Sequence, residues 1–102
     1  MNVEIRTGTI VAADNFPEAK NPAYKLTVDF GDFGLRKTSA QITALYSIDE
    51  LIGMQIVAVV NFPVKQIANF FSECLILGVI GENEEVTLLT TERKVLNGLR
   101  IG

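Results

Sequence analysis

The sequence predicts an all-β domain, a small barrel with one short helix, and three observations favour this fold class. Several short segments alternate apolar with polar residues, which is the period of a half-buried strand. A single capping-box pattern marks one short helix. The chain has 102 residues, of which 48% are apolar and 21% charged, as in a globular domain. We therefore expect one domain over residues 1–102.

The first half of the chain predicts three strands. Residues 3–13 carry apolar or β-branched side chains at alternate positions, and Gly8 in their middle suggests a bend or bulge. A segment rich in proline and asparagine follows and is typical of a loop. Residues 24–30 alternate most regularly and form the clearest strand, and residues 35–43 are expected to return after a glycine turn.

A short helix is expected at residues 48–52. Ser47 and Glu50 have the spacing of a capping box, in which each side chain satisfies a free backbone donor of the first turn. Tyr46 before the cap and Leu51 after it fit the hydrophobic staple that often accompanies such a cap. The helix would thus separate the third strand from the fourth.

The second half of the chain predicts further strands at residues 54–62, 74–80 and 86–90, and Asn97-Gly98 indicates a turn in the tail. Five or more strands with a helix between the third and the fourth is the order of an OB-fold, a five-stranded Greek-key barrel. We therefore expect an OB-fold with extra C-terminal strands. Such barrels bind ligands on the face of strands two and three and on adjoining loops.

Two polar segments are candidates for ligand contact. Lys37, Ser39 and Gln41 alternate along the third expected strand and so share a face, which Arg36 does not. The segment "NFPVKQIANFFSE", residues 61–73, separates two apolar strands and holds many amides and aromatic residues. Long loops without secondary structure are usually functional, so its polar residues are expected to recognise a polymer; Lys65, Gln66 and Asn69 are the foremost of these.

Structural roles are the alternative for several residues of this segment. Asn61, Asn69 and Ser72 could bond to the backbone of their own loop, as such side chains readily do. Glu73 could pair with Lys65 across the loop.

The aromatic residues and the cysteine also have two interpretations. Phe70 or Phe71 could stack on an unpaired base, but anchoring of the loop in the core is favoured for both. Cys74 is expected to fill the core, because nothing near it in sequence would lower its pKa.

Composition excludes several classes of function. The absence of histidine and the presence of one cysteine argue against a zinc site, any other metal site and a His-based catalytic pair, and no nucleotide-binding motif occurs. We expect neither an enzyme nor a cofactor. No signal peptide or membrane-spanning run is found, and a lone cysteine fits a reducing compartment, so a cytoplasmic location is expected.

Four stretches of the chain resemble one family closely. They are "VEIRTGTIVAADNFPEAKNPAYKLTVDFG", "SAQIT", "YSIDELIGMQIVAVVNFP" and "KQIANFFSECLILG". They are similar to the CsaA-type secretion chaperones, within the wider tRNA-binding-domain family that also supplies the appended domain of methionyl- and phenylalanyl-tRNA synthetases. The resemblance implies an OB barrel and a homodimer. It also implies ligand-facing roles for nine residues: Lys37, Ser39, Gln41, Asn61, Lys65, Gln66, Asn69, Ser72 and Glu73.

The resemblance leaves two functions to compare. The first is a chaperone with an export-related activity that binds unfolded preprotein segments or peptides. The alternative is a tRNA-binding protein without a chaperone role. The formal charge of −3 favours the first, because a dimer would carry twice that charge and repel RNA unless its basic residues form a separate face. The family usually carries a short helical lead-in before the first strand, and we expect none here, where the first strand begins near residue 3.

Overall fold

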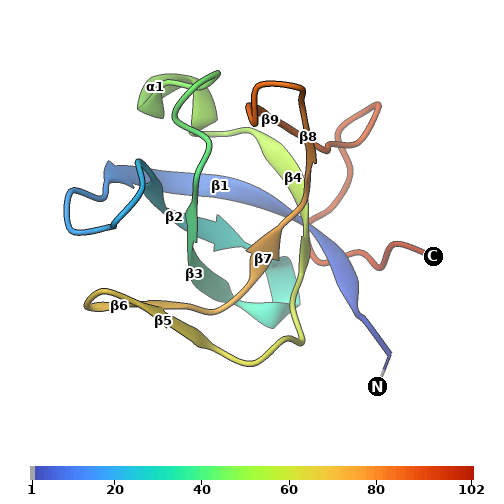
Figure 1. Cartoon of the computed structure of the whole chain (residues 1–102). Coiled ribbons are helices and arrows are strands. Elements are labelled where there is room, and N and C mark those ends of the chain that lie inside the picture. Colours follow the sequence, from blue (N-terminus) through green and yellow to red (C-terminus); the bar gives the residue numbers. More distant parts are fainter. Residues whose placement is uncertain (1) are drawn as a thin grey trace.

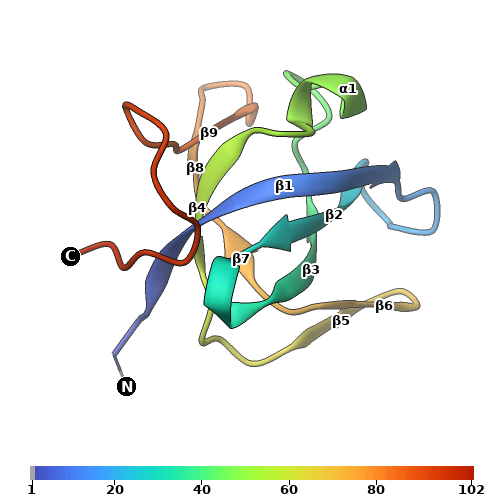
Figure 2. The same cartoon turned by 180° about the vertical axis from the view of Figure 1, so that it is seen from behind.

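The computed structural model describes residues 2–102 and shows a five-stranded antiparallel sheet that curls into a nearly closed barrel (Figure 1 and, from behind, Figure 2). The strand order is β3-β2-β1-β4-β7. The strands are β1 (Ile5–Asn15), β2 (Tyr24–Asp29), β3 (Leu35–Ala40), β4 (Gln55–Val59) and β7 (Leu75–Ile76). A 3-10 turn (Gly31–Phe33) joins β2 to β3, and the helix α1 (Ile48–Leu51) lies between β3 and β4. This arrangement confirms the predicted OB-fold.

Two hairpins extend from the barrel. One is formed by β5 (Lys65–Ile67) and β6 (Phe70–Ser72), and the other by β8 (Gly78–Ile80) and β9 (Val86–Leu88). The prediction that residues 61–73 form a loop without secondary structure is therefore wrong. Three-residue strands around a two-residue turn are too short to leave a clear alternating pattern in the sequence.

The strand expected at residues 74–80 is divided at Leu77. Its backbone N–H donates to the Val57 carbonyl at 3.0 Å, which continues the pairing of β7 with β4. Its carbonyl accepts from the Leu89 N–H at 3.1 Å, which begins the pairing of β8 with β9. Leu77 is thus the point where the chain leaves the barrel for the second hairpin.

Strand β1 contains the irregularity that Gly8 suggested, but at another position. The pairing of β1 with β2 shifts register between Ile10 and Ala12. A Cβ on Gly8 would lie 2.6 Å from Val28 Cγ1 and 2.8 Å from Phe30 Cε1. The glycine therefore serves close packing, and the bulge lies two residues further along.

The core fills the barrel and is capped at one end by α1. The fully buried side chains on the strands and the helix include Ile10, Leu26, Val28, Phe30, Leu51 and Ile56. The predicted capping box is confirmed: the Ser47 side chain accepts from the Glu50 N–H, and the Glu50 carboxylate accepts from the Ser47 N–H. Tyr46 packs against the core with Leu51, as the staple predicts.

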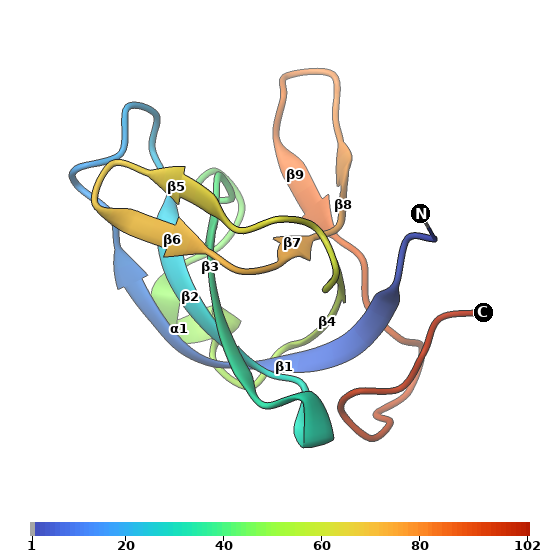
Figure 3. The ribbon, with the colours of Figure 1, turned by 90° about the horizontal axis from the view of Figure 1, so that it is seen from below.

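The barrel closes where β3 meets the chain between β6 and β7, which Figure 3 shows from below. The Glu73 N–H donates to the Lys37 carbonyl at 2.7 Å, and the Glu73 side chain accepts from the Lys37 N–H at 2.8 Å. The Thr38 hydroxyl donates to the Cys74 carbonyl at 2.8 Å. These bonds close one end of the gap between β3 and β7.

Within residues 2–102, no helix is long and apolar enough to span a membrane.

Candidate functional site

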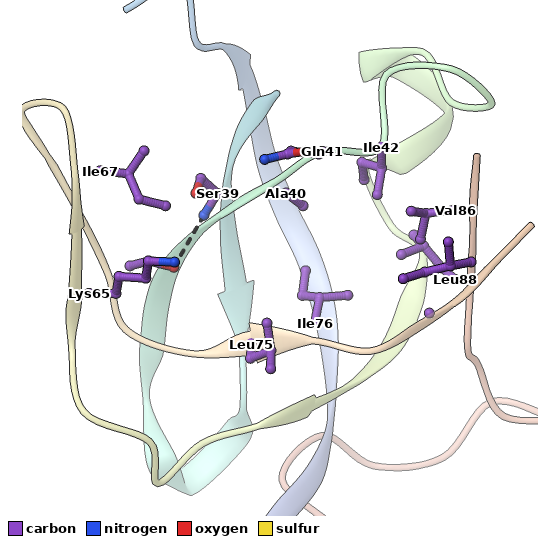
Figure 4. A pocket seen from close by; sticks show the side chains of 13 residues that line it. Ser39, Ala40, Gln41, Ile42, Lys65, Ile67, Leu75, Ile76, Val86 and Leu88 are labelled. Carbon is purple, nitrogen blue, oxygen red and sulfur yellow. Dashed lines mark hydrogen bonds between the residues drawn. The ribbon is translucent and has the colours of Figure 1, made fainter. Parts of the chain in front are cut away.

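An elongated groove opens beside β3, between that strand, the β5–β6 hairpin and β7 (Figure 4). Its volume is about 330 Å³. Seven large aliphatic side chains form most of its wall: Ile42, Ile67, Leu75, Ile76, Ile80, Val86 and Leu88. We call this the apolar groove. A concave apolar surface with a few polar groups is the usual form of a ligand site.

Polar groups line the end of the groove nearest the β5–β6 hairpin. Ser39 and Gln41 come from β3 and the residues after it, and Lys65 comes from β5. A second hollow of about 180 Å³ continues from them and adds Lys20 and Asn21 from the loop after β1. The residues that line these two hollows include two lysines and no acidic residue. The polar end is therefore locally cationic in a chain of net negative charge.

Lys37 lies apart from this groove. It is exposed and lines a separate hollow of about 200 Å³ together with Asp14, Lys25, Thr27 and Phe70. The structure thus places Ser39, Gln41 and Lys65 around one site and Lys37 beside another. The hydrogen bonds between Lys37 and Glu73 lie where the barrel closes. Lys65 and Phe70 line different hollows but belong to one hairpin, so the two hollows are neighbours.

Four of the nine predicted contact residues make internal hydrogen bonds through their side chains, and among them Asn61 and Ser72 bond to residues outside the 61–73 segment. The Asn61 side chain accepts from the Glu4 N–H at 2.9 Å and donates to the Asn2 carbonyl at 2.6 Å, so it holds the N-terminal segment. The Ser72 hydroxyl lies 2.9 Å from the Thr38 hydroxyl, on β3. Structural bonding was the alternative for Asn61 and Ser72, but their partners lie outside the 61–73 segment.

Glu73 and Gln66 have internal bonds of different kinds. The Glu73 carboxylate accepts from the Lys37 backbone, and the predicted pairing with Lys65 is not formed. The Gln66 amide donates to the Ala68 carbonyl at 3.1 Å in the turn of its own hairpin. Asn69, the other residue of that turn, is exposed. Gln66 and Asn69 therefore lie at the hairpin tip, away from the wall of the apolar groove.

The phenylalanines of the hairpin region have different environments. Phe70 packs edge-on against Phe16, with ring centroids 5.4 Å apart. Phe71 is 56% exposed, so the prediction that it anchors the segment in the core is wrong. Neighbours in a strand point to opposite faces, so only one of the two could pack inward. The exposed ring leaves an aromatic surface on the outer face of β6.

Cys74 lies in the core, as predicted. Burial raises the pKa of its thiol to about 11, and the hydrogen bond with Thr38 opposes this effect in part. At neutral pH the thiol is therefore protonated and unreactive. In the part of the chain that the structure describes, no cluster of three metal-ligating side chains occurs.

The sequence pattern did not identify the aliphatic wall of the groove. Ile42, Ile76, Ile80 and Val86 have the alternation or clustering of ordinary core residues. Ile42 is buried and Ile76 and Val86 are half-buried, whereas Ile80 is exposed because the division of the chain at Leu77 directs β8 away from the barrel. Only the short length of the strands and the glycine at position 78 could have indicated this.

Comparison with known proteins adds a family to this geometry. Residues 5–100 match the family model described as "Putative tRNA binding domain". A crystal structure of chaperone CsaA from Bacillus anthracis str. Ames is 47% identical, with a TM-score of 0.94, over 98% of this chain and 91% of that one. A CsaA chaperone structure from Picrophilus torridus is 50% identical, with a TM-score of 0.93, over 99% and 92%.

The curated relatives include a methionine–tRNA ligase from Methanocaldococcus jannaschii, which is 27% identical over 99 residues. That match covers 97% of this chain but 15% of the ligase, so the similarity concerns one small part of the enzyme. The family model covers nearly the whole chain, and the two CsaA structures share its fold throughout. The chain therefore belongs to the tRNA-binding-domain family, as a CsaA-type member.

Proposed function

We propose that this protein is a non-catalytic, CsaA-like chaperone of the cytoplasm that holds unfolded segments of preproteins before their export. The observation that carries the proposal is the apolar groove, with its seven large aliphatic side chains and its polar end at Ser39, Gln41 and Lys65. The CsaA structures, at 47% and 50% identity, support the same reading.

The groove has the physical properties that such a role needs. Its aliphatic wall favours apolar side chains, at about 25 cal/mol for each Å² removed from water. Unfolded chains expose such side chains and folded proteins bury them. The amide of Gln41 can both donate and accept, so it suits the backbone of many different peptides. The groove would therefore select unfolded chains without reading a particular sequence.

We also propose that the protein acts as a homodimer. Val79 in β8 is 57% exposed and points to the face of the strand opposite Ile80, which lines the groove. A two-stranded hairpin with apolar residues on both faces is marginal alone in water and favours burial against another chain. Light scattering should give twice the chain mass of 11.2 kDa, and a particle of the chain mass itself would contradict the proposal.

Substitution of Leu75 tests the chaperone proposal. Leu75 lies in the groove wall and is 47% exposed, whereas Leu99 lies in the C-terminal segment outside the groove and is 45% exposed. Leu75→Asp should abolish the binding of fluorescent, permanently unfolded α-lactalbumin and the suppression of its aggregation. Leu99→Asp should leave both unchanged, since it places the same charge at a matched exposure elsewhere.

Melting temperature and light scattering on both variants check that fold and oligomeric state are preserved. If the wild-type protein, present in molar excess over the unfolded client, does not bind it, the chaperone proposal fails. If Leu75→Asp binds as well as the wild type, the client binds somewhere other than the groove.

A second candidate function is tRNA binding, and a different hollow favours it. Lys25 and Lys37 line that hollow beside Phe70, and Phe71 is exposed on the same hairpin. Lysines with a neighbouring aromatic ring suit the phosphates and bases of single-stranded RNA. The two candidate functions thus use neighbouring but different surfaces, and the salt dependence of binding distinguishes them.

A further inference from the structure

Backbone groups without partners lie just past the end of β3. The Phe30 N–H donates to the Gly34 carbonyl at 3.0 Å, and hydrogen-bonded pairs alternate in an antiparallel ladder. The backbone groups of even-numbered residues of β3 therefore face β2, and those of Lys37 and Ser39 face away from it. Lys37 is paired with Glu73, and the Ser39 N–H donates to the Ser72 hydroxyl at 3.4 Å. The N–H and carbonyl of Gln41, which follows the strand, have no hydrogen-bond partner among residues 2–102.

The opposite side of the groove has a similar edge. Leu77 donates to Val57 of β4, so Ile76 directs its backbone groups away from β4, toward β3. The Cys74 carbonyl, which faces the same way, is bonded to Thr38. No backbone partner of Ile76 is found on that side in residues 2–102. The groove therefore lies between two strand edges that are joined at Thr38 and Cys74 and unpaired beyond them.

We propose that the apolar groove binds an extended polypeptide segment as an added β-strand, which pairs with the free backbone groups of Gln41, next to the end of β3. This inference rests on the proposed chaperone function and gives it a binding mode. Backbone pairing supplies affinity that does not depend on sequence, while pockets for alternate side chains supply a preference. The barrel would gain a short strand in the gap that β3 and β7 leave open.

The lining of the groove sets the chemistry of that segment. In a strand alternate side chains point the same way, so aliphatic residues at every second position would enter the wall formed by Ile42, Ile67 and Ile76. The polar end has Lys20 and Lys65 and no acidic lining residue. An acidic residue or a C-terminal carboxylate is therefore preferred at that end, and a basic one is disfavoured.

Synthetic peptides test the backbone pairing directly. The probe is a short fluorescent peptide with valine at alternate positions, threonine between them and glutamate at one end. Two analogues of this peptide carry N-methyl groups, one on the odd-numbered amides and the other on the even-numbered amides. Methylation removes the N–H donors of that set and keeps the side chains. At least one analogue should bind about fivefold more weakly in fluorescence anisotropy, because a hydrogen bond of about 1 kcal/mol to the Gln41 carbonyl is lost.

Substitution at Gln41 tests the same contact from the protein side. Gln41→Pro removes the backbone N–H, whereas Gln41→Ala removes the side chain and keeps that N–H. The proline variant should bind the unmodified peptide about fivefold more weakly, and the alanine variant should bind it within about twofold of the wild type. If Gln41→Pro does not fold, the methylated peptides still decide the question on the wild-type protein.

The outcomes separate this inference from the chaperone proposal. If both methylated analogues bind as tightly as the parent peptide, the added strand is wrong, and a side-chain-only groove remains. If the parent peptide and the unfolded client both fail to bind, both proposals are wrong. A peptide with lysine in place of the terminal glutamate should bind more weakly, and this difference should disappear in Lys65→Met; equal binding of the two peptides to the wild type would overturn the charge preference.

Discussion

Gly8 lies in the middle of β1, beneath the side chains of Val28 and Phe30. A Cβ at this position would approach both of them within 3 Å, and both neighbours are fully buried. A buried aromatic ring between packed strands has little room to shift. The glycine is therefore a packing requirement of the barrel.

Gly8→Ala should lower the free energy of unfolding by about 1–3 kcal/mol, the usual cost of overpacking a core. Urea denaturation measures the change. Gly102→Ala is the matched control, because nothing lies within 4 Å of a Cβ there, and it should change stability by less than about 0.5 kcal/mol. Equal midpoints for the two variants would show that the core adjusts to the extra methyl group.

Cys74 gives the stability a defined dependence on alkaline pH. Burial raises the pKa of its thiol from 9.0 to about 11 in the folded state. Below pH 9 the thiol is protonated in the folded and in the unfolded state, and its contribution to the free energy of unfolding is fully present. Between pH 9 and 11 the unfolded thiol ionises while the folded thiol does not, so that contribution is lost as the pH rises.

The wild type should therefore lose about 2–3 kcal/mol of stability over this interval relative to Cys74→Ala, at 1.36 kcal/mol per pKa unit. Urea titrations of both proteins between pH 8 and pH 11 give the difference, since lysines and tyrosines titrate alike in the two. A constant difference across the interval would mean that the native thiol ionises as freely as the unfolded one.

The β5–β6 hairpin is the element whose attachment shapes the candidate site. It contributes Lys65 and Ile67 to the groove, and it is joined to the barrel through β6 and through Glu73, which follows β6. The latch consists of two hydrogen bonds between Glu73 and Lys37 and the contact of Ser72 with Thr38. Local openings of such a hairpin would widen the groove.

Glu73→Ala should loosen this hairpin without unfolding the barrel. The Lys37 N–H loses its acceptor, and the net cost of one such hydrogen bond is about 1 kcal/mol. Hydrogen exchange should become faster at Lys37 and along β5 and β6, and stay unchanged in β1 and β4. Glu82→Ala, an exposed acid in the β8–β9 turn, is the control. Unchanged exchange at Lys37 would show that the Glu73 side chain does not hold the latch.

The whole molecule separates its charges, although its net charge is negative. Lys20, Lys25, Lys37 and Lys65 line the hollows beside β2, β3 and β5. Glu82, Glu84 and Glu85 are in or next to the turn of the β8–β9 hairpin. A basic side on an acidic protein can attract phosphate at short range, because salt screens the remaining charge beyond about 8 Å.

We expect tRNA binding, the second candidate function, to weaken steeply as salt rises. Lys25→Glu and Lys37→Glu should each lower the slope of log K against log [salt] by about 0.7–0.9, one phosphate contact. Lys94→Glu, an exposed lysine of the C-terminal segment, is the control. Anisotropy titrations in a potassium chloride series measure this. Slopes that are the same in all variants would exclude this face as the RNA site, whereas peptide binding in the groove should change little with salt.

The sequence by itself determined the barrel. The alternation over residues 24–30, the capping box at Ser47 and the position of the helix between two strands are local signals, and each specified an element that the structure contains. They are readable because the period of a strand and the chemistry of a helix cap depend on near neighbours in the chain. The resemblance of the 61–78 segment to the CsaA-type family was also present in the residues alone.

Only the tertiary structure decided which residues form the candidate site. The polar pattern indicated Ser39, Gln41 and Lys65, which line the groove, but it grouped them with Lys37, which lines another hollow. It could not show that the side chains of Asn61 and Glu73 form hydrogen bonds with partners that lie between 36 and 59 positions away in the sequence. Burial and hydrogen-bond partners are properties of the folded chain, so a side chain in a groove and one in a core look alike until the strands are placed.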